Sequence, residues 1–304
     1  MRPWLDQAHG CPRAGYDGFM SNRTVSTYSS AETARIQAWP MLKWRRAVEH
    51  MHGLSARVDI FNERRTYAAP IRLSTDGTAL QFLRPDGVQP PLEEWALYFA
   101  DAVHNLRASL DSLAWELSVA QGTVPANPRR VYFPVAQTEA DWKSAVAGLD
   151  TVDEEFLARI KRVQPFFEEG PAEDHLLSIL TRLDNAEKHR RTLVSRFDLF
   201  ELEFGGTWKF EEAEAQGEAG FLVHTLEDPK PGEVVAEFHW GAPITQTSDE
   251  PGSAPMAVTP MVTLDDRYFP ALEFLPQAAE WVRHTIDFVR RGEAATTEPL
   301  DEPA

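Results

Sequence analysis

The chain has very little cysteine: Cys11 is the only one among 304 residues, so no disulfide can form within it. Structural zinc sites built on several cysteines are excluded for the same reason. The sequence also lacks any run of about 18 apolar residues, so we expect no membrane-spanning helix. Its first twenty residues lack the continuous apolar core of a secretion signal. These absences favour a reduced, soluble, cytoplasmic protein.

Basic residues are also scarce, because 30 Lys and Arg stand against 47 Asp and Glu, for a formal net charge of −17. Such a chain repels nucleic acids and anionic membranes as a whole, so binding either would need a local basic patch. The phosphate-binding patterns GxxxxGKS/T and GxGxxG and the GxSxG hydrolase pattern are absent, and we expect no cofactor. Large apolar residues are plentiful, since 9 Trp and 17 Phe can fill a substantial core.

The periodicity of the apolar residues predicts an α+β fold, mainly a helical bundle with an inserted antiparallel β region. A C-terminal helix is expected to return to the bundle and close it. Helices are expected where apolar residues recur every three or four positions. These ranges are 31–63, 92–121, 138–148, 153–164, 172–195 and 271–291.

Two segments are expected to form strands. Residues 66–84 read as a short hairpin around the turn pair Asp76-Gly77, and residues 197–265 read as four or five antiparallel strands. We expect one interrupted domain over 31–291. A disordered leader over 1–30 and a disordered acidic tail over 292–304 would flank it.

The stretch DAVHNLRASLDSLAWEL, residues 101–117, carries charged side chains opposite its apolar stripe. Asp101, His104, Arg107 and Asp111 follow one another at steps of three, three and four, so they share one helical face. His104 titrates near neutrality, Arg107 offers a fixed cationic fork, and Asp111 could orient either one. The group could bind a phosphate or run acid–base chemistry, or it could be an ion-pair network that holds the helix to its neighbours.

The stretch LDNAEKHRR, residues 183–191, brings a second set of charges. Asp184 and Glu187 continue the apolar stripe of their helix, so each calls for a partner across the interface, with Arg107 and Lys188 as the obvious candidates. If the two helices pack together, their polar side chains form one candidate site. Its catalytic candidates are His104, Arg107, Asp111 and His189, and its binding candidates are Asp184, Asn185, Glu187, Lys188 and Arg190.

Together the two stretches resemble an uncharacterised family of bacterial proteins with the helix motifs AVHNLRxxLDxL and NxxKHR. The resemblance covers about residues 80–200 and implies no established activity. The pattern is similar in turn to HEPN domains, helical bundles, often dimeric, that include metal-independent ribonucleases with an Arg followed a turn or more later by a His. Here Ser112 stands where that His would be, and Ala108 follows Arg107, so the residue that would move protons is missing.

Two interpretations of function stay open. In the first, the chain is an interaction or regulatory protein, with a homodimer as one form, and the charged helix face is a structural or dimer-contact network. In the second, it is a HEPN-like RNA-binding protein or ribonuclease, in which Arg107 holds the scissile phosphate and His104 or His189 moves protons. Local basic clusters would then guide RNA phosphates. These are residues 43–46, 129–130, 159–162 and 188–191.

The nine histidines do not favour a metal site. They form neither HExxH nor a tight His and Asp triad, so we expect no bound metal.

Overall fold

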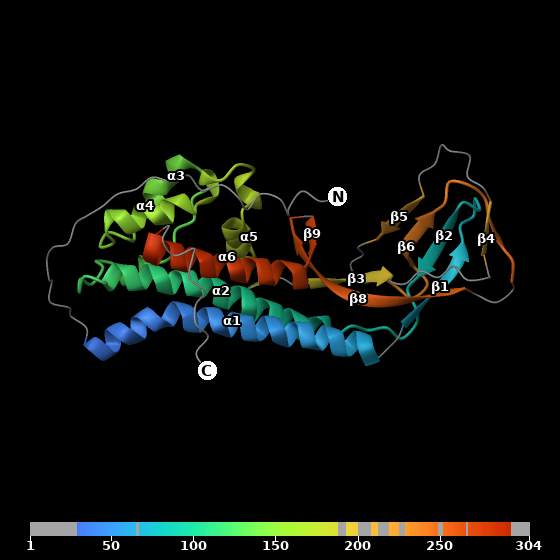
Figure 1. Cartoon of the computed structure of the whole chain (residues 1–304), viewed down its shortest axis with the longest axis horizontal. Helices are drawn as coiled ribbons and strands as arrows, with labels where there is room; N and C mark the ends of the chain where they lie inside the picture. Colours follow the sequence, from blue (N-terminus) through green and yellow to red (C-terminus); the bar gives the residue numbers. More distant parts are fainter. Residues whose placement is uncertain are drawn as a thin grey trace.

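The computed structural model describes residues 29–64, 67–187, 193–199, 208–211, 219–224, 229–248, 252–265 and 267–292. Within them, helices and antiparallel strands form a mixed α and β fold. Figure 1 shows a long bundle of helices with the β strands gathered at one end. The predicted leader and acidic tail, except for Ser29, Ser30 and Gly292, lie outside the described residues.

The described helices match most of the predicted ones in position. Bounds of α6 are those predicted, and α1 and α2 each end within two residues of the predicted limits. The six α-helices are α1 (Ser30–Arg64), α2 (Leu92–Val119), α3 (Glu139–Ala145), α4 (Glu154–Arg162), α5 (Leu176–Glu187) and α6 (Ala271–Arg291). Three short 3-10 helices accompany them: η1 (Pro128–Arg130), η2 (Pro165–Phe167) and η3 (Ala172–Asp174).

The described strands pair antiparallel throughout. One sheet has the order β3-β8-β1-β2-β6-β5, with β9 also paired to β8, and β4 and β7 form a separate pair. The predicted hairpin is therefore part of the same sheet as the later strands. The strands are β1 (Tyr67–Leu73), β2 (Ala79–Leu83), β3 (Leu193–Leu199), β4 (Trp208–Phe210), β5 (Gly220–Val223), β6 (Val234–His239), β7 (Ile244–Gln246), β8 (Ser253–Leu264) and β9 (Arg267–Pro270).

The helix predicted over 172–195 is wrong at both ends. It begins at Leu176, because His175 turns its side chain back and Nδ1 accepts a hydrogen bond from the Leu177 N–H at 3.1 Å. At the other end Leu193 and the two residues after it belong to β3, where Leu193 lies opposite Val262 of β8. Pairing with a distant strand overrides the local helical periodicity. The count of four or five strands is also too low, since six of the described strands lie between residues 193 and 264.

The helix predicted over 138–148 is shorter than expected and ends at Ala145. Its start is fixed by a capping box, in which Thr138 accepts from the Asp141 N–H and Asp141 accepts from the Thr138 N–H. After it, Gly148 lies directly against the carbonyl oxygen of Arg130, so only glycine fits there.

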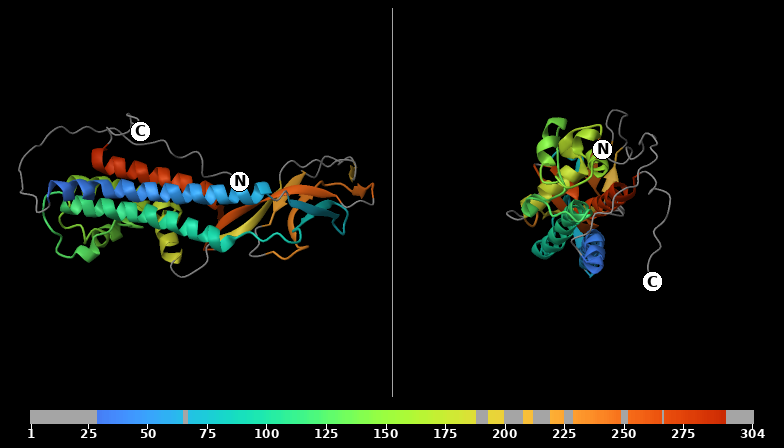
Figure 2. Two further views of the ribbon diagram at one scale, coloured as in Figure 1. Left: turned by 90° about the horizontal axis from the view of Figure 1, so that it is seen from below. Right: turned by 90° about the vertical axis from the view of Figure 1, so that its left-hand side faces the viewer.

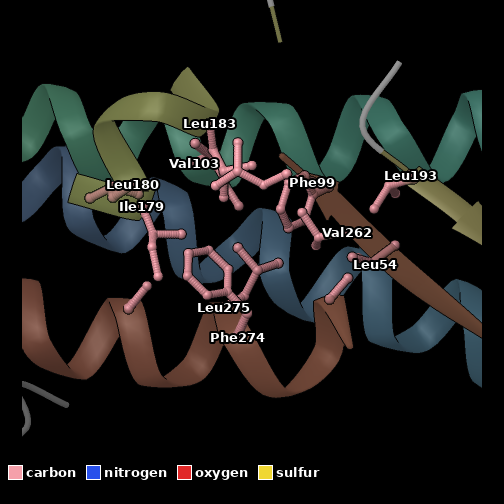
Figure 3. Packing of buried hydrophobic residues seen from close by; sticks show 14 of the residues in the cluster. Leu54, Phe99, Val103, Ile179, Leu180, Leu183, Leu193, Val262, Phe274 and Leu275 are labelled. Carbon is pink, nitrogen blue, oxygen red and sulfur yellow. The ribbon is translucent and has the colours of Figure 1, made fainter. Parts of the chain in front are cut away.

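The core is built around α2, which contacts α1, α5 and α6. Trp95, Phe99, Leu106 and Leu110 are fully buried along one side of α2. Figure 3 shows Phe99 and Val103 of α2 packed between Leu180 and Leu183 of α5 and Phe274 and Leu275 of α6. In the described ranges, no helix combines the length and the apolar character needed to cross a bilayer.

Candidate functional site

Arg107 lies inside the bundle, although its sequence position places it on the charged face of α2. Only 9% of its side chain is exposed. Its Nη2 donates to the carbonyl oxygen of Phe133 at 2.7 Å and lies 3.1 Å from Oδ1 of Asp111, one turn further along α2. The other terminal nitrogen, Nη1, is buried and makes no hydrogen bond. The guanidinium is thus directed at groups of its own chain.

Asp111 closes this arrangement from the same helix. Its Oδ1 accepts a hydrogen bond from the Phe133 N–H at 2.8 Å, so α2 holds both the N–H and the carbonyl of Phe133. Burial raises the pKa of Asp111 above its ordinary value, although the Arg107 charge and the Phe133 N–H act in the opposite direction. We call this unit, Arg107, Asp111 and the main chain of Phe133, the Arg107 brace.

The segment that contains Phe133 is held at further points. Gln164, fully buried after α4, accepts from the Ala136 N–H at 2.9 Å and donates to the Ile160 carbonyl at 3.1 Å. Gln137 donates to Oγ of Ser178 on α5 at 3.0 Å. The Arg107 brace is therefore one of three polar attachments that fix residues 133–137 between α2, α4 and α5.

His104 and Asp184 join α2 to α5. Nδ1 of His104 donates to Oδ1 of Asp184 at 3.0 Å, since a carboxylate can only accept. The two side chains differ in exposure, at 60% for His104 and 13% for Asp184. We predicted Arg107 or Lys188 as a partner of Asp184. Arg107 is turned toward Phe133 instead, and Lys188 lies outside the described residues, so His104 is the partner that the described part of the chain shows.

The other predicted site residues are divided by the structure. Asn185 and Asp101 are exposed, and Oδ2 of Asp101 lies 3.7 Å from Nδ1 of His50 on α1. The helical residue Glu187 has no described side chain. Lys188, His189 and Arg190 lie outside the described residues. In the described part, the predicted site is thus the Arg107 brace and the neighbouring His104–Asp184 pair.

Members of the basic clusters are used in several internal contacts. Arg159 donates from Nη1 to the carbonyls of Val289 and Arg290 at 2.9 and 3.1 Å, and so caps the end of α6. Lys161 pairs with Glu139 at 2.7 Å. Arg129 and Arg130 are exposed in the loop after α2, and the 188–191 cluster lies outside the described residues.

Two cavities are lined by ion pairs that the sequence did not indicate. One of about 660 Å³ borders the β8–β9 turn, where Arg182 pairs with Asp265 and Arg267 pairs with Asp174. A smaller one of about 310 Å³ lies between α1, α2, α4 and α6. There Arg290 bonds Glu116 at 2.6 Å and the Gln37 carbonyl at 2.6 Å, and burial raises the pKa of Glu116. Each of these arginines has a carboxylate beside it.

A metal centre has no support in this arrangement. Among the residues that the structure describes, no three His, Cys, Asp or Glu side chains are grouped so that they could hold a metal ion.

The brace could not be found from the sequence, because its third member is the main chain of Phe133, 26 residues from Arg107. Every residue type except proline offers the same backbone N–H and carbonyl, so no side-chain pattern marks the position. No protein-family model, curated protein or solved structure matches the chain.

Proposed function

We propose that this chain is an interaction protein whose charged two-helix network is structural. The observation that carries the proposal is the burial of Arg107 against a carbonyl and a carboxylate of its own chain. An arginine that binds a phosphate must present its guanidinium to the ligand. Arg107 instead ties α2 to the segment at Phe133, and loss of that tie would leave buried polar groups without partners.

Ser112 supports the same interpretation. It stands at the position of the histidine in the HEPN pattern, and its Oγ donates to the Ala108 carbonyl of its own helix at 2.7 Å. A serine in this local bond cannot take over proton transfer near neutral pH, because its hydroxyl has no titration there. At the Arg and His positions of the HEPN pattern, this chain thus has the buried Arg107 and Ser112, whose hydroxyl is bonded to its own helix.

His104 favours the second candidate, a HEPN-like RNA-binding protein or ribonuclease. The ring is mostly exposed, and because Nδ1–H faces Asp184, Nε2 is the basic nitrogen of the neutral imidazole. A carboxylate behind a histidine is a common arrangement for a general base. Arg107, one turn further along α2, is directed inward to Phe133 and so does not supply a solvent-facing cation beside His104, which the first proposal does not require.

A partner of the interaction protein would bind the outer face of α1 and α2. Large apolar side chains are exposed on these two helices, with Leu97 of α2 at 68% and Leu42 and Trp39 of α1 at 47% and 41%. Exposed apolar residues that share one face are typical of protein contacts. A second copy of the chain is the partner that we propose for this face, which makes the protein a homodimer.

The function is tested by incubating the purified chain with end-labelled single-stranded RNA and tRNA, once with EDTA and once with Mg²⁺. Variants Arg107→Met and His104→Ala are assayed beside the wild-type chain. We expect no cleavage by any of the three and a lower urea midpoint for Arg107→Met. Cleavage in EDTA that is lost in His104→Ala would establish the ribonuclease and overturn the proposal.

A further inference from the structure

The smaller of the two cavities, of about 310 Å³, lies where four helices meet. Figure 2 shows the start of α1 and the ends of α2 and α6 together at the end of the bundle that is far from the strands. The cavity is lined by residues of these three helices and of α4. We call it the Glu116 cavity, after its acidic lining residue.

Most of the cavity wall is apolar. Ile36 of α1, Leu117 and Val119 of α2 and Phe156 of α4 supply aliphatic and aromatic surface. Leu117 and Val119 are each only 5% exposed, so this part of the wall belongs to the packed core. Spaces between helices that have apolar walls and a few polar groups are typical of small-molecule sites. Since a dry cavity of about 150 Å³ holds one benzene ring, this one has room for two fused rings.

Glu116 and Arg290 form the polar end of the cavity. Nη2 of Arg290 donates to Oε2 of Glu116 and to the carbonyl of Gln37, each at 2.6 Å, so the guanidinium is anchored to both α2 and α1. The other carboxylate oxygen of Glu116, Oε1, makes no hydrogen bond to any described residue and is accessible to solvent. Because Glu116 lines the cavity, a bound molecule can reach this free acceptor.

The charges at this end are already balanced, because the carboxylate of Glu116 is paired with Arg290. Burial raises the pKa of Glu116, since a charge at this position is poorly solvated. A charged ligand would bring an unpaired charge to the same place and lose its own hydration. A neutral O–H or N–H group costs less to bury and can donate to Oε1. The cavity therefore favours a neutral donor over an ion.

We infer that the Glu116 cavity binds a neutral, mainly apolar small molecule of about two fused rings, whose hydroxyl or N–H group donates a hydrogen bond to Oε1 of Glu116. Its rings contact Ile36, Leu117 and Phe156. The molecule joins α1, α2 and α4 beside the anchored guanidinium of Arg290, and so stabilises this end of the bundle. This binding site is independent of the proposed protein partner, because it lies between the helices.

Isothermal titration calorimetry of the full chain tests the class of ligand with three probes. Indole carries a neutral N–H, 1-methylindole lacks that donor, and indole-3-carboxylate keeps the donor but adds a negative charge. We expect indole to bind with a Kd of about 100 µM, and at least about tenfold more tightly than either of the other two. No binding of indole at about 1 mM, or equal affinities for the three probes, would overturn the inference.

Glu116→Gln tests the acceptor, because it removes the carboxylate and keeps the shape of the side chain. The affinity for indole should fall by about tenfold, and the advantage of indole over 1-methylindole should shrink to less than about threefold. Glu280→Gln removes an exposed carboxylate of α6 and is the matched control, which should bind indole as the wild-type chain does. If Glu116→Gln bound indole as tightly as this control, Oε1 would not be the acceptor.

Ile36→Trp tests the place of binding, because the larger side chain fills part of the cavity. It should weaken the binding of indole by at least about tenfold. The control is Ile60→Trp, at an exposed residue about 36 Å further along α1, and it should leave the affinity unchanged. Far-UV circular dichroism of each variant confirms that it is folded. Unchanged binding of indole by Ile36→Trp would place the ligand elsewhere and contradict the site.

Discussion

Replacing Arg107 with methionine removes the cationic member of the Arg107 brace while keeping most of its volume. The carbonyl of Phe133, a fully buried residue, then loses its donor at 2.7 Å. Asp111 loses its counter-charge at 3.1 Å but keeps the Phe133 N–H at 2.8 Å. The change therefore leaves one buried acceptor unpaired and one carboxylate partly paired.

The two losses differ in size. An unpaired buried carbonyl costs about 1–3 kcal/mol. The side chain of Asp111 is 37% exposed, so water can replace part of the lost pairing and about 1 kcal/mol is a fair value for it. Nη1 of Arg107 is buried without a hydrogen-bond partner, and methionine has no such group. Its removal therefore offsets part of the lost stability. We expect the free energy of unfolding to fall by roughly 2–3 kcal/mol.

Urea unfolding followed by far-UV circular dichroism and tryptophan fluorescence measures this loss. With a slope of about 2.5 kcal/mol per molar urea, the midpoint should fall by about 1 M. The exposed Arg45 on α1 gives the matched control, and Arg45→Met should change the free energy of unfolding by less than about 0.5 kcal/mol. If Arg107→Met were as stable as that control, Arg107 would not be a structural residue.

Three further changes follow from single contacts. Because burial raises the folded-state pKa of Asp111, its contribution to stability is greatest at low pH and is lost as pH rises through that raised pKa. Asp111→Asn removes this dependence on pH. The free energy of unfolding of the variant, measured with urea, should therefore rise relative to that of wild type between about pH 4 and about pH 7. If the two curves of unfolding free energy against pH ran parallel, the pKa of Asp111 would not be raised. Gly148→Ala places a Cβ against the backbone carbonyl of Arg130 and should lower the melting temperature through a loss of about 2–4 kcal/mol, whereas an unchanged melting temperature would mean that this loop moves freely. Trp44→Phe removes the 2.7 Å bond from Nε1 to the Ala279 carbonyl and should cost about 1–2 kcal/mol in urea unfolding; no loss would show that this tie between α1 and α6 is dispensable.

The sequence predicts an element well where the residues of that element alone determine its structure. The apolar periods of α1, α2 and α6 continue for many turns, and such repeats are decided locally. Residues 193–195 follow the end of a helical pattern, yet they form β3 because β8 offers them backbone hydrogen bonds. That partner lies more than sixty residues away in the chain, and no local propensity reports it.

The candidate site shows the same limit. Spacing placed His104, Arg107 and Asp111 on one helix correctly, but it could not show that Arg107 turns inward while His104 turns outward. Their exposure depends on which segment covers each part of α2. For Arg107 that segment is the loop at Phe133, which offers only backbone groups.

A double-mutant cycle on Arg107 and Asp111 is the most direct test of the account. Arg107→Met, Asp111→Leu and the double variant are compared with wild type by urea unfolding. We expect the double variant to lose at least about 1 kcal/mol less than the two single losses together, because the two side chains stabilise each other inside the fold. Losses that simply add would show that the two side chains act independently. The claim that Arg107 and Asp111 form one structural network would then be wrong.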